Sequence, residues 1–513
     1  MYKPLMYDLK YYFFLFLLFF YSCNKSNSSE KSQPNIIYIL ADDLGYGELG
    51  VYGQKLIETP NIDKLAKTGM IFNNHYTGAP VCAPARSVLL TGKHTGNTHI
   101  RANDERNERG NVWSFKAMLD DPNLEGQGPL LDSILTVANV LQDNGYKTGM
   151  VGKWGLGAPL TNSVPNKKGF DFFYGYNCQR QAHTYYPTHL WKNDKRHLLN
   201  NYIVTKQEGL GENVDPYDSK SYEKYNQKDY SPALMHEEAL DFIDRNQNNS
   251  FFLYYASPLP HLPLQGPKKW VDYYVNKFGT EEPYLGGSYF PNKNPRATYA
   301  AMISYLDQQV GEIVEKLKEI GEYDNTLIIF TSDNGPSWVE QVDYNFFNST
   351  GIFVNSRNTM KGSVSEGGIR VPMIASWPNA IKAGSVSNHI SSFYDFFSTA
   401  CDIANIEGPF NTDGISFYPT LQGKNQTQHD YLYWEYPASG GLQAIRMGKW
   451  KGVKKNLFKT DSKLELYDLS NDPMELTDVS KRFPNKIKLL ENYLDEAHTT
   501  PTVKKFRIPF LEE

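Results

Sequence analysis

Short runs of apolar residues recur along the chain, and each run ends in polar residues. Four of these runs are residues 36–40, 147–151, 251–256 and 326–330. Their length and their lack of alternation predict strands that are buried on both faces of a parallel sheet. Between them, the spacing of apolar positions predicts helices over residues 132–143, 231–246 and 296–320. This alternation predicts an α/β fold in which helices flank a large, mostly parallel central sheet.

The pattern changes in the last part of the chain. From Tyr431, the segments YLYWEY, LQAIRMG, KWKGVKK and LELYDLS predict a small antiparallel sheet, and a helix follows over residues 484–499. Residues 385–423 are expected to be helical with a glycine-rich loop, whereas residues 158–230 are expected to form loops and short elements. The expected domains are an α/β domain over residues 34–425 and an antiparallel-sheet subdomain over residues 426–513.

The N-terminus has the pattern of a targeting segment. Two lysines precede the apolar run YYFFLFLLFFY, which is too short to span a bilayer as a mature helix. The arrangement resembles a bacterial lipoprotein signal, with residues 1–23 as the signal segment, Cys23 as the lipidated membrane anchor and residues 24–33 as a flexible tether. Phe20 and Tyr21 fit the usual lipobox poorly, so plain secretion stays open. Both alternatives predict export in a bacterium, to the periplasm or as a lipoprotein of the outer membrane or cell surface.

Charge and cysteine content exclude two classes of protein. The net charge of -5 and the pI of about 6.2 indicate no basic surface for nucleic acid. The four cysteines are Cys23, Cys82, Cys178 and Cys401. No pair has zinc spacing, and if Cys23 is acylated and Cys82 has a special role, at most one disulfide remains, Cys178 with Cys401. No disulfide framework therefore holds this fold.

Oxygen-bearing side chains follow two of the predicted strands. Asp42 and Asp43 come after the first apolar run, and Asp333 and Asn334 come after the last, with glycine close behind in both cases. The carboxyl ends of parallel strands open onto the ligand crevice of an α/β sheet. Four oxygen ligands without histidine or thiolate describe a site for a hard cation, Ca²⁺ rather than Zn²⁺.

The segment Cys82-Ala83-Pro84-Ala85-Arg86 combines a cysteine, a rigid turn and a fixed cation at the start of a predicted helix. A helix N-terminus favours anions, and a guanidinium suits an oxyanion. Lys153 and His261 each follow a predicted strand, among glycines and between prolines respectively. The residues expected to converge on the cation site are Cys82, Arg86, Lys153, His261 and Lys361. They describe a pocket for a small tetrahedral oxyanion with one imidazole for proton transfer.

Together these motifs resemble those of the formylglycine-dependent sulfatases of the alkaline-phosphatase-like superfamily. The matching segments are ADDLGYG, CAPARSVLLTGKHTG, GKWGLG, SPLPHLP, TSDNGP and MKGSVSEGGIRVP. AIRMGKWKGV and ELYDLSNDPMELTDVS resemble the C-terminal subdomain of that family, so the resemblance covers residues 34 to about 500. The Cys-x-Pro-x-Arg motif is highly specific.

The resemblance implies an enzyme that removes sulfate from a sulfated carbohydrate. It implies that a maturation enzyme oxidises Cys82 to formylglycine, whose hydrate attacks sulfur with one hydroxyl and releases sulfate with the second. Arg86 would orient the hydrate. Lys153 and Lys361 would bind sulfate oxygens, and His261 would protonate the departing alcohol. The implied Ca²⁺ ligands are Asp42, Asp43, Cys82, Asp333 and Asn334.

One position departs from the pattern of that family. Many members have a histidine in a Gly-Lys-Trp-His-Leu-Gly motif, which is assigned to the second hydroxyl, but this chain has Gly155 there. His94, His99 or His183 could substitute for it. Our hypothesis is His94, because it lies nearest in sequence to the helix that starts at Cys82.

The segments GKWGLG, TGKHTGNTHIR and YNCQRQAHTYYPTHLW are similar to a branch of bacterial polysaccharide sulfatases. Members of that branch act on galactose or N-acetylgalactosamine sulfates. The sugar contacts that this likeness nominates are Arg101, Gln179, Arg180 and His183.

Two other functions remain as alternatives. The first is a phosphatase or phosphonate monoester hydrolase on the same scaffold, but those enzymes often have a serine or threonine nucleophile where this chain has Cys82. The second is an inactive, surface-anchored glycan-binding protein. The presence of every expected metal ligand, both lysines and His261 argues against it.

Overall fold

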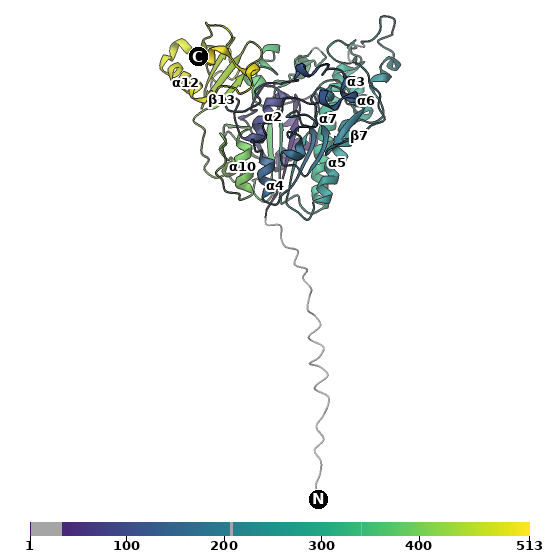
Figure 1. Ribbon diagram of the computed structural model, residues 1–513, viewed down its shortest axis with the longest axis horizontal. Helices are drawn as coiled ribbons and strands as arrows, with labels where there is room; N and C mark the ends of the chain where they lie inside the picture. Colours follow the sequence, from purple (N-terminus) through teal and green to yellow (C-terminus); the bar gives the residue numbers. More distant parts are fainter. Residues whose placement is uncertain (2–32, 206–208, 340, 513) are drawn as a thin grey trace. The chain divides into compact units, whose positions relative to one another are not determined.

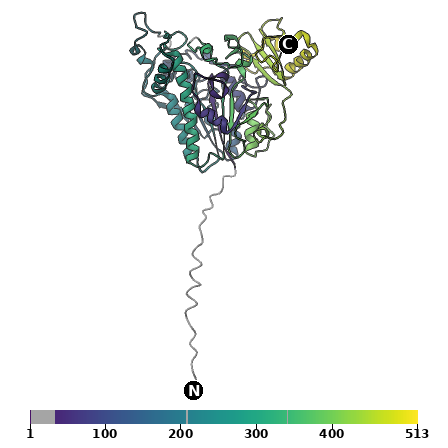
Figure 2. The same cartoon turned by 180° about the vertical axis from the view of Figure 1, so that it is seen from behind.

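Figures 1 and 2 show the computed structural model, which describes residue 1 and residues 33–512 apart from 206–208 and 340. The predicted signal segment beyond residue 1, the lipidation site Cys23 and the tether up to residue 32 lie outside the described residues. Lipidation and export therefore stay predictions. In the part of the chain that the structure describes, no helix has both the length and the apolar character to cross a membrane.

A ten-stranded sheet lies at the centre of the described residues, in the order β11-β2-β10-β9-β1-β8-β4-β5-β6-β7. Its strands are β1 (Asn35–Ala41), β2 (Met70–Phe72), β4 (Lys147–Lys153), β5 (Phe172–Tyr176), β6 (His189–Lys192), β7 (Lys195–Leu198), β8 (Phe251–Ala256), β9 (Thr326–Ser332), β10 (Met373–Ser376) and β11 (Ser385–Ser387). Strands β9, β1, β8, β4 and β5 run parallel, and antiparallel pairs with β10 and β6 extend both sides. The predicted large, mostly parallel sheet is confirmed.

The side chains of β1 enter two different hydrophobic cores, which explains why its positions are apolar without alternation. Ile36, Tyr38 and Leu40 belong to one core, and Ile37 and Ile39 belong to the other. The first core includes helices α2 (Cys82–Thr91), α4 (Val137–Asp143) and α10 (Asp395–Ile403). The second includes α1 (Pro60–Thr68), α5 (Ser231–Arg245), α6 (Lys268–Phe278) and α7 (Pro295–Glu319). Helices therefore cover both faces of the sheet, as Figure 1 shows.

Two predicted segments differ from the structure. Helix α4 starts at Val137 and not at residue 132, because the hydroxyl of Thr136 accepts a hydrogen bond from the backbone N–H of Asn139 and caps the helix there. The helix predicted over residues 385–423 is wrong in its first part, where β11 pairs with β2. The segment expected to form loops and short elements, residues 158–230, contains the short strands β5, β6 and β7, in agreement with that expectation.

The C-terminal segments form the predicted antiparallel sheet, with strands β13 (Leu432–Tyr436), β14 (Leu442–Met447), β15 (Trp450–Lys455) and β16 (Leu464–Asp468) in that order. Leu490 and Leu494 of α12 (Pro484–Ala497) pack on one face of it, near Tyr433. Trp434 faces the other way, into the core that contains α2, and its Nε1 donates to the carbonyl of Thr77 at 2.8 Å. The small sheet is therefore joined to the α/β body by a shared core.

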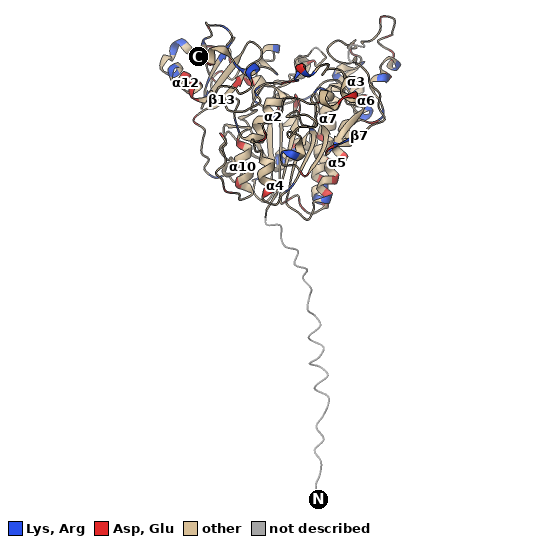
Figure 3. Cartoon of the chain, in the orientation of Figure 1, with Lys and Arg blue, Asp and Glu red and all other residues tan. Residues whose placement is uncertain are grey.

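Shorter elements of the described residues are β3 (His75–Tyr76), β12 (Ser391–Ser392), α3 (Phe115–Asp120), α8 (Tyr344–Phe347), α9 (Glu366–Ile369) and α11 (Tyr418–Leu421). Among the cysteines that the structure describes, Cys178 and Cys401 are free and buried, so the disulfide left open by the cysteine count is absent. Acidic and basic residues alternate over the described helices (Figure 3), in agreement with the small net charge of -5.

Candidate active site

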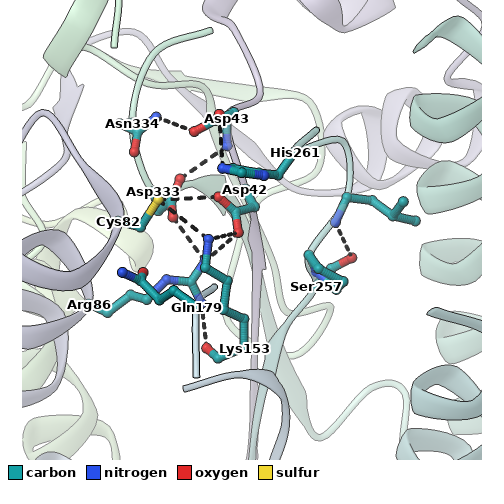
Figure 4. A network of polar contacts seen from close by, with 12 residues as sticks. Asp42, Asp43, Cys82, Arg86, Lys153, Gln179, Ser257, His261, Asp333 and Asn334 are labelled. Atoms are coloured by element: carbon teal, nitrogen blue, oxygen red, sulfur yellow. Dashed lines mark hydrogen bonds and ion pairs between the residues drawn. The ribbon is translucent and has the colours of Figure 1, made fainter. Parts of the chain in front are cut away.

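The carboxyl ends of the central parallel strands meet at one place in the sheet (Figure 4). Leu40 of β1 lies beside Ala256 of β8 and Thr331 of β9, so these three strands end at the same level. The side chains that gather there are Asp42 and Asp43 after β1, Lys153 at the end of β4, His261 after β8, Asp333 and Asn334 after β9, Cys82 and Arg86 from α2, and Lys361 from the loop before α9. The structure thus brings together every residue that the sequence predicted for the cation site and the oxyanion pocket.

The acidic residues of this cluster are tied to one another. The backbone N–H of Asp43 donates to Oδ1 of Asp333 at 3.1 Å, and Nδ2 of Asn334 donates to Oδ1 of Asp43 at 2.8 Å. All three side chains are buried. Asp43 has φ +65°, a backbone conformation that aspartate tolerates better than most residues. The turn after β1 is therefore held in place by contacts with the end of β9.

This cluster fits a hard divalent cation. Candidate ligand atoms that lie within 4.8 Å of one another come from Asp42, Asp43, Cys82 and His261. Oδ1 of Asn334 is buried and accepts no hydrogen bond from the described residues, so it is an acceptor that a cation would satisfy. Burial and then the negative charge of Asp42 raise the pKa of Asp333 to about 6. A bound cation would offset that repulsion.

The thiol of Cys82 lies between charged groups. Its Sγ is 3.5 Å from Oδ1 of Asp42, 3.5 Å from Nζ of Lys153 and 3.7 Å from Nζ of Lys361. Burial and then the charge of Asp42 raise the pKa of this thiol. Because the thiolate is the nucleophilic form of cysteine, Cys82 is a poor nucleophile as an unmodified residue.

Three cations surround the cluster. Nη2 of Arg86 lies 2.9 Å from Oδ2 of Asp333 and 3.2 Å from Oδ2 of Asp42, and Nζ of Lys153 lies 2.6 Å from Oδ2 of Asp42. Nζ of Lys361 lies 2.7 Å from Oδ1 of Asp43. Burial alone would raise the pKa of Asp42, but Lys153 and the neighbouring cations hold it well below its usual range. The site therefore holds fixed positive charge close to Cys82.

His261 directs one ring nitrogen, Nε2, toward the acidic cluster. Its Nδ1 lies 2.6 Å from the carbonyl oxygen of Leu262, and since a carbonyl only accepts, Nδ1 carries the hydrogen. Nε2 lies 3.7 Å from Oδ2 of Asp43. Burial and then the charge of Lys361 lower the pKa of His261 to about 4. The imidazole is thus neutral at neutral pH in the free protein.

A pocket of about 520 Å³ opens beside Asp43 and Lys361. Its aromatic lining is formed by Tyr289, Trp338 and Tyr436, and its further cations are Arg357 and Lys455. The guanidinium of Arg357 lies 3.9 Å from the ring centroid of Trp338. Sequence reasoning missed these five residues. Trp338 carried a signal, because it closely follows the polar end of β9, whereas Tyr436 and Lys455 come from the C-terminal sheet and carried none.

The nominated sugar contacts lie in different surroundings. Arg101 is 1% exposed, pairs with Glu435 at 2.8 Å and donates to the carbonyl of Gly96. Its nomination as a sugar contact is therefore wrong, since its guanidinium joins the α/β body to the C-terminal sheet. Arg180 is held by Glu105 at 2.6 Å. Arg180 also lines a second pocket of about 270 Å³, together with His183 and Trp113.

The three histidines proposed to replace the one missing at position 155 lie in different parts of the structure. His94 lies beyond the far end of α2, about 15 Å of helix away from Cys82, and its ring lies 5.2 Å from that of Tyr433. Nδ1 of His99 lies 2.9 Å from Oγ1 of Thr502 near the C-terminus. The hypothesis for His94 is therefore wrong. His183 is the one of the three that reaches the site, because its ring stacks on that of His261 at 5.4 Å.

The similarity to known proteins covers most of the chain. The family model described as Sulfatase matches residues 34–406, and the model described as N-sulphoglucosamine sulphohydrolase, C-terminal matches residues 359–499. The chain is 31% identical to the N-acetylgalactosamine-6-sulfatase of Homo sapiens over 438 residues, which cover 83% of this chain and 72% of that protein.

Solved structures have the same fold. The crystal structure of Ps i-CgsB in complex with k-i-k-neocarrahexaose has a TM-score of 0.70 and 28% identity, and the match covers 92% of this chain and 94% of that one. The protein BT33336S-sulf of Bacteroides thetaiotaomicron, described in work on the metabolism of multiple glycosaminoglycans, has a TM-score of 0.68 and 25% identity. That match covers 93% of this chain and 100% of the other.

Proposed function

The chain belongs to the sulfatase family and hydrolyses sulfate esters, and on this premise we propose that its substrate is a galactose or N-acetylgalactosamine sulfate in a polysaccharide or host glycan. The observation that carries the proposal is the position of Cys82. Its Sγ lies within 3.7 Å of Asp42, Lys153 and Lys361, and Lys361 lines the pocket of about 520 Å³. A sulfate group on a sugar in that pocket would meet position 82 and two ammonium groups together.

The lining of the pocket supports a saccharide substrate. Tyr289, Trp338 and Tyr436 offer flat apolar faces to a pyranose ring, and Arg357 and Lys455 offer hydrogen-bond donors to its polar substituents. The names of two similar proteins agree with this class, because one is an N-acetylgalactosamine-6-sulfatase and the other was crystallised with a carrageenan-type oligosaccharide. We extend that chemistry to this chain as a proposal.

Two groups that the family implies complete the proposed site. We propose that a maturation enzyme oxidises Cys82 to formylglycine, whose hydrate supplies the hydroxyl that attacks sulfur. The unmodified thiol is a poor candidate for that role because its pKa is raised. A Ca²⁺ ion held by the residues of the acidic cluster would supply positive charge that offsets the charge of the ester. Its protein ligands would be Asp42, Asp43, Asp333, Asn334 and the modified residue 82.

The remaining residues bind, orient and transfer a proton. The ammonium groups of Lys153 and Lys361 both lie close to position 82, where Lys153 pairs with Asp42 and Lys361 pairs with Asp43. Both are placed to bind sulfate oxygens. Arg86 holds the carboxylates of Asp42 and Asp333 in position. His261 protonates the departing alcohol through Nε2, since its Nδ1–H is committed to Leu262. The negative charge of the bound ester raises the pKa of this imidazole from its low value in the free protein.

The overall reaction balances with water alone. One hydrate oxygen would bond to sulfur as the S–O bond to the sugar breaks, and the alcohol would leave with a proton from His261. The C–O bond of the hydrate would then break to release sulfate and restore the aldehyde, which water hydrates again, so the net reaction is ester plus water to alcohol plus hydrogen sulfate. Export from the cell, with Cys23 as the site of a lipid anchor, is part of the proposal, since polysaccharides and host glycans are encountered outside the cytoplasm.

A direct experiment compares substrates on protein that was co-expressed with a formylglycine-generating enzyme. We expect sulfate release from sulfated galactose or N-acetylgalactosamine, and much slower turnover of the matching phosphate esters. Preferred turnover of the phosphate ester would favour the phosphatase alternative. Saturable binding of the sulfated sugar without turnover would favour the inactive glycan-binding alternative.

A further inference from the structure

The side chain of Gln179 occupies the space next to Gly155. Gly155 follows β4 and has φ +75°. A Cβ atom built on it would lie 2.8 Å from Cγ, 3.0 Å from Cδ and 3.0 Å from Oε1 of Gln179. The 2.8 Å contact is shorter than packed side chains show, so a larger residue at position 155 would require the side chain of Gln179 to move from its present position. The two positions share one volume.

The surroundings of Gln179 hold its backbone and leave one amide atom unused. The residue is 4% exposed, and its N–H donates to Oε1 of Gln127 at 3.0 Å. Nε2 lies 3.4 Å from Oδ1 of Asn103, which also accepts from the backbone N–H of Ala83 at 3.1 Å. Gln179 is thus linked through one side chain to the residue after Cys82, and Figure 4 shows it among the side chains around Cys82.

The unused atom is an acceptor. Oε1 of Gln179 is buried and has no hydrogen-bond donor among the described residues. A buried acceptor without a partner is costly to retain, so its persistence points to a donor that arrives with the modified residue or with substrate. The three heavy atoms nearest to a Cβ built on Gly155 all belong to Gln179.

We propose that Gln179 replaces the histidine missing at position 155 and accepts a hydrogen bond from the second hydroxyl of the hydrated group at position 82. This inference rests on the proposed function, because it requires the formylglycine hydrate. An amide accepts a hydrogen bond but does not take up a proton at neutral pH. Gln179 therefore takes the place of the histidine only in orienting the hydroxyl, and the proton of that hydroxyl leaves with the released group as hydrogen sulfate.

A set of variants separates this role from packing. Gln179→Met keeps a side chain of similar volume and removes the acceptor, so we expect kcat to fall about tenfold, the loss of one hydrogen bond, while the thermal unfolding midpoint changes little. Gln309→Ala is the control, because Gln309 is a buried glutamine that bonds to Tyr255 and Pro232 outside the site. It should lower stability and leave kcat unchanged.

Thermal unfolding of protein with unmodified Cys82 tests whether the side chains at positions 155 and 179 compete for the same space, and this test needs no enzymatic activity. Gly155→His should lower the thermal unfolding midpoint through the overlap with Gln179 and through the strain of a non-glycine residue at φ +75°, and adding Gln179→Ala should recover the share that comes from the overlap. In matured protein, the double variant should also gain a titrating limb in the pH profile of kcat, in addition to any limb that His261 gives the wild type. If the loss of stability in the double variant equals the sum of the losses in the two single variants, positions 155 and 179 do not compete for the same space.

The outcomes separate this inference from the proposed function. If the wild type is active and Gln179→Met retains its kcat, the acceptor role of Gln179 is wrong. The same conclusion follows if the variant changes KM alone, since that result would make Gln179 a sugar contact. If matured wild type releases no sulfate from any sulfated sugar, the proposed function itself fails, and the inference fails with it.

Discussion

Arg86 and Asp333 form an ion pair in which neither side chain is exposed, with Nη2 2.9 Å from Oδ2. The same nitrogen also lies 3.2 Å from Asp42, so one guanidinium joins the carboxylates that follow β1 and β9. Both Arg86 and Cys82 belong to the first turns of α2. The contact that holds the acidic residues together therefore also fixes the helix that presents position 82.

Removal of this guanidinium should destabilise the fold strongly. Arg86→Leu leaves two buried carboxylates without their common partner, and breaking a buried pair in this way costs about 3–5 kcal/mol. Urea unfolding of the variant measures the loss. The control is Lys268→Leu, which removes an exposed pair with Asp272 and should cost about 1 kcal/mol or less. Equal losses in the two variants would contradict the structural role of Arg86.

Calcium should stabilise the protein through the acidic cluster. At a free concentration of about 100 times Kd, a ligand that binds only the folded state adds about 2.7 kcal/mol, so the unfolding midpoint should rise with Ca²⁺ and fall with a chelator. Asn334→Ala removes the buried acceptor Oδ1 and should reduce this response. Asn355→Ala, on the loop beyond the site, should respond like the wild type. A wild type that is indifferent to Ca²⁺ would rule out this metal.

Maturation should change the chemistry of Cys82. In protein co-expressed with a formylglycine-generating enzyme, mass spectrometry of the peptide that contains Cys82 should show sulfur replaced by oxygen and two hydrogens lost. Cys82→Ala should abolish sulfate release and keep the unfolding midpoint near that of the wild type, because the substitution removes a single buried sulfur atom and no ion pair. Full activity in protein that carries only the thiol would contradict the proposed mechanism.

Replacement of the tryptophan in each of the two pockets should show which pocket binds the sugar. Trp338 lines the pocket beside Lys361, whereas Trp113 lines the pocket that contains Arg180 and His183. If the sugar binds beside Lys361, Trp338→Ala should raise KM about tenfold with little change in kcat, since stacked aromatic contacts contribute about 0.5–1.5 kcal/mol. Trp113→Ala serves as the matched control. The reverse result would assign the sugar to the second pocket and support the nominations of Arg180 and His183.

The sequence predicted the parts of the site that lie at strand ends. Asp42 and Asp43 could be located because β1 is short, wholly apolar from Ile36 and followed at once by carboxylates, and the ends of parallel strands meet in space. His94 failed because closeness in sequence misleads along a helix, which carries the chain about 1.5 Å farther from Cys82 with each residue. Tyr436 was missed because its position depends on how the C-terminal sheet packs against the α/β body, and no local pattern encodes that.

A buried histidine far from the reaction should make stability sensitive to acid. His75 in β3 is 2% exposed, and its Nδ1 lies 2.9 Å from Oγ of Ser391. Burial and then the charge of His389 lower the pKa of His75 to about 3, well below the ordinary histidine value of 6.5. Between these two pKa values the unfolded state binds a proton that the folded state does not. The contribution of His75 to the free energy of unfolding is therefore fully present above pH 6.5 and decreases as the pH is lowered.

The size of this effect can be measured by substitution. From a pH of about 7.5 to a pH of about 5, His75 should account for about 2 kcal/mol of lost stability, and His75→Gln should remove that share because glutamine does not titrate. The measurement is the free energy of unfolding by urea at both pH values. His197→Gln, at an exposed position of β7, should keep the wild-type difference. An unchanged difference in His75→Gln would mean that His75 is not buried as a neutral imidazole.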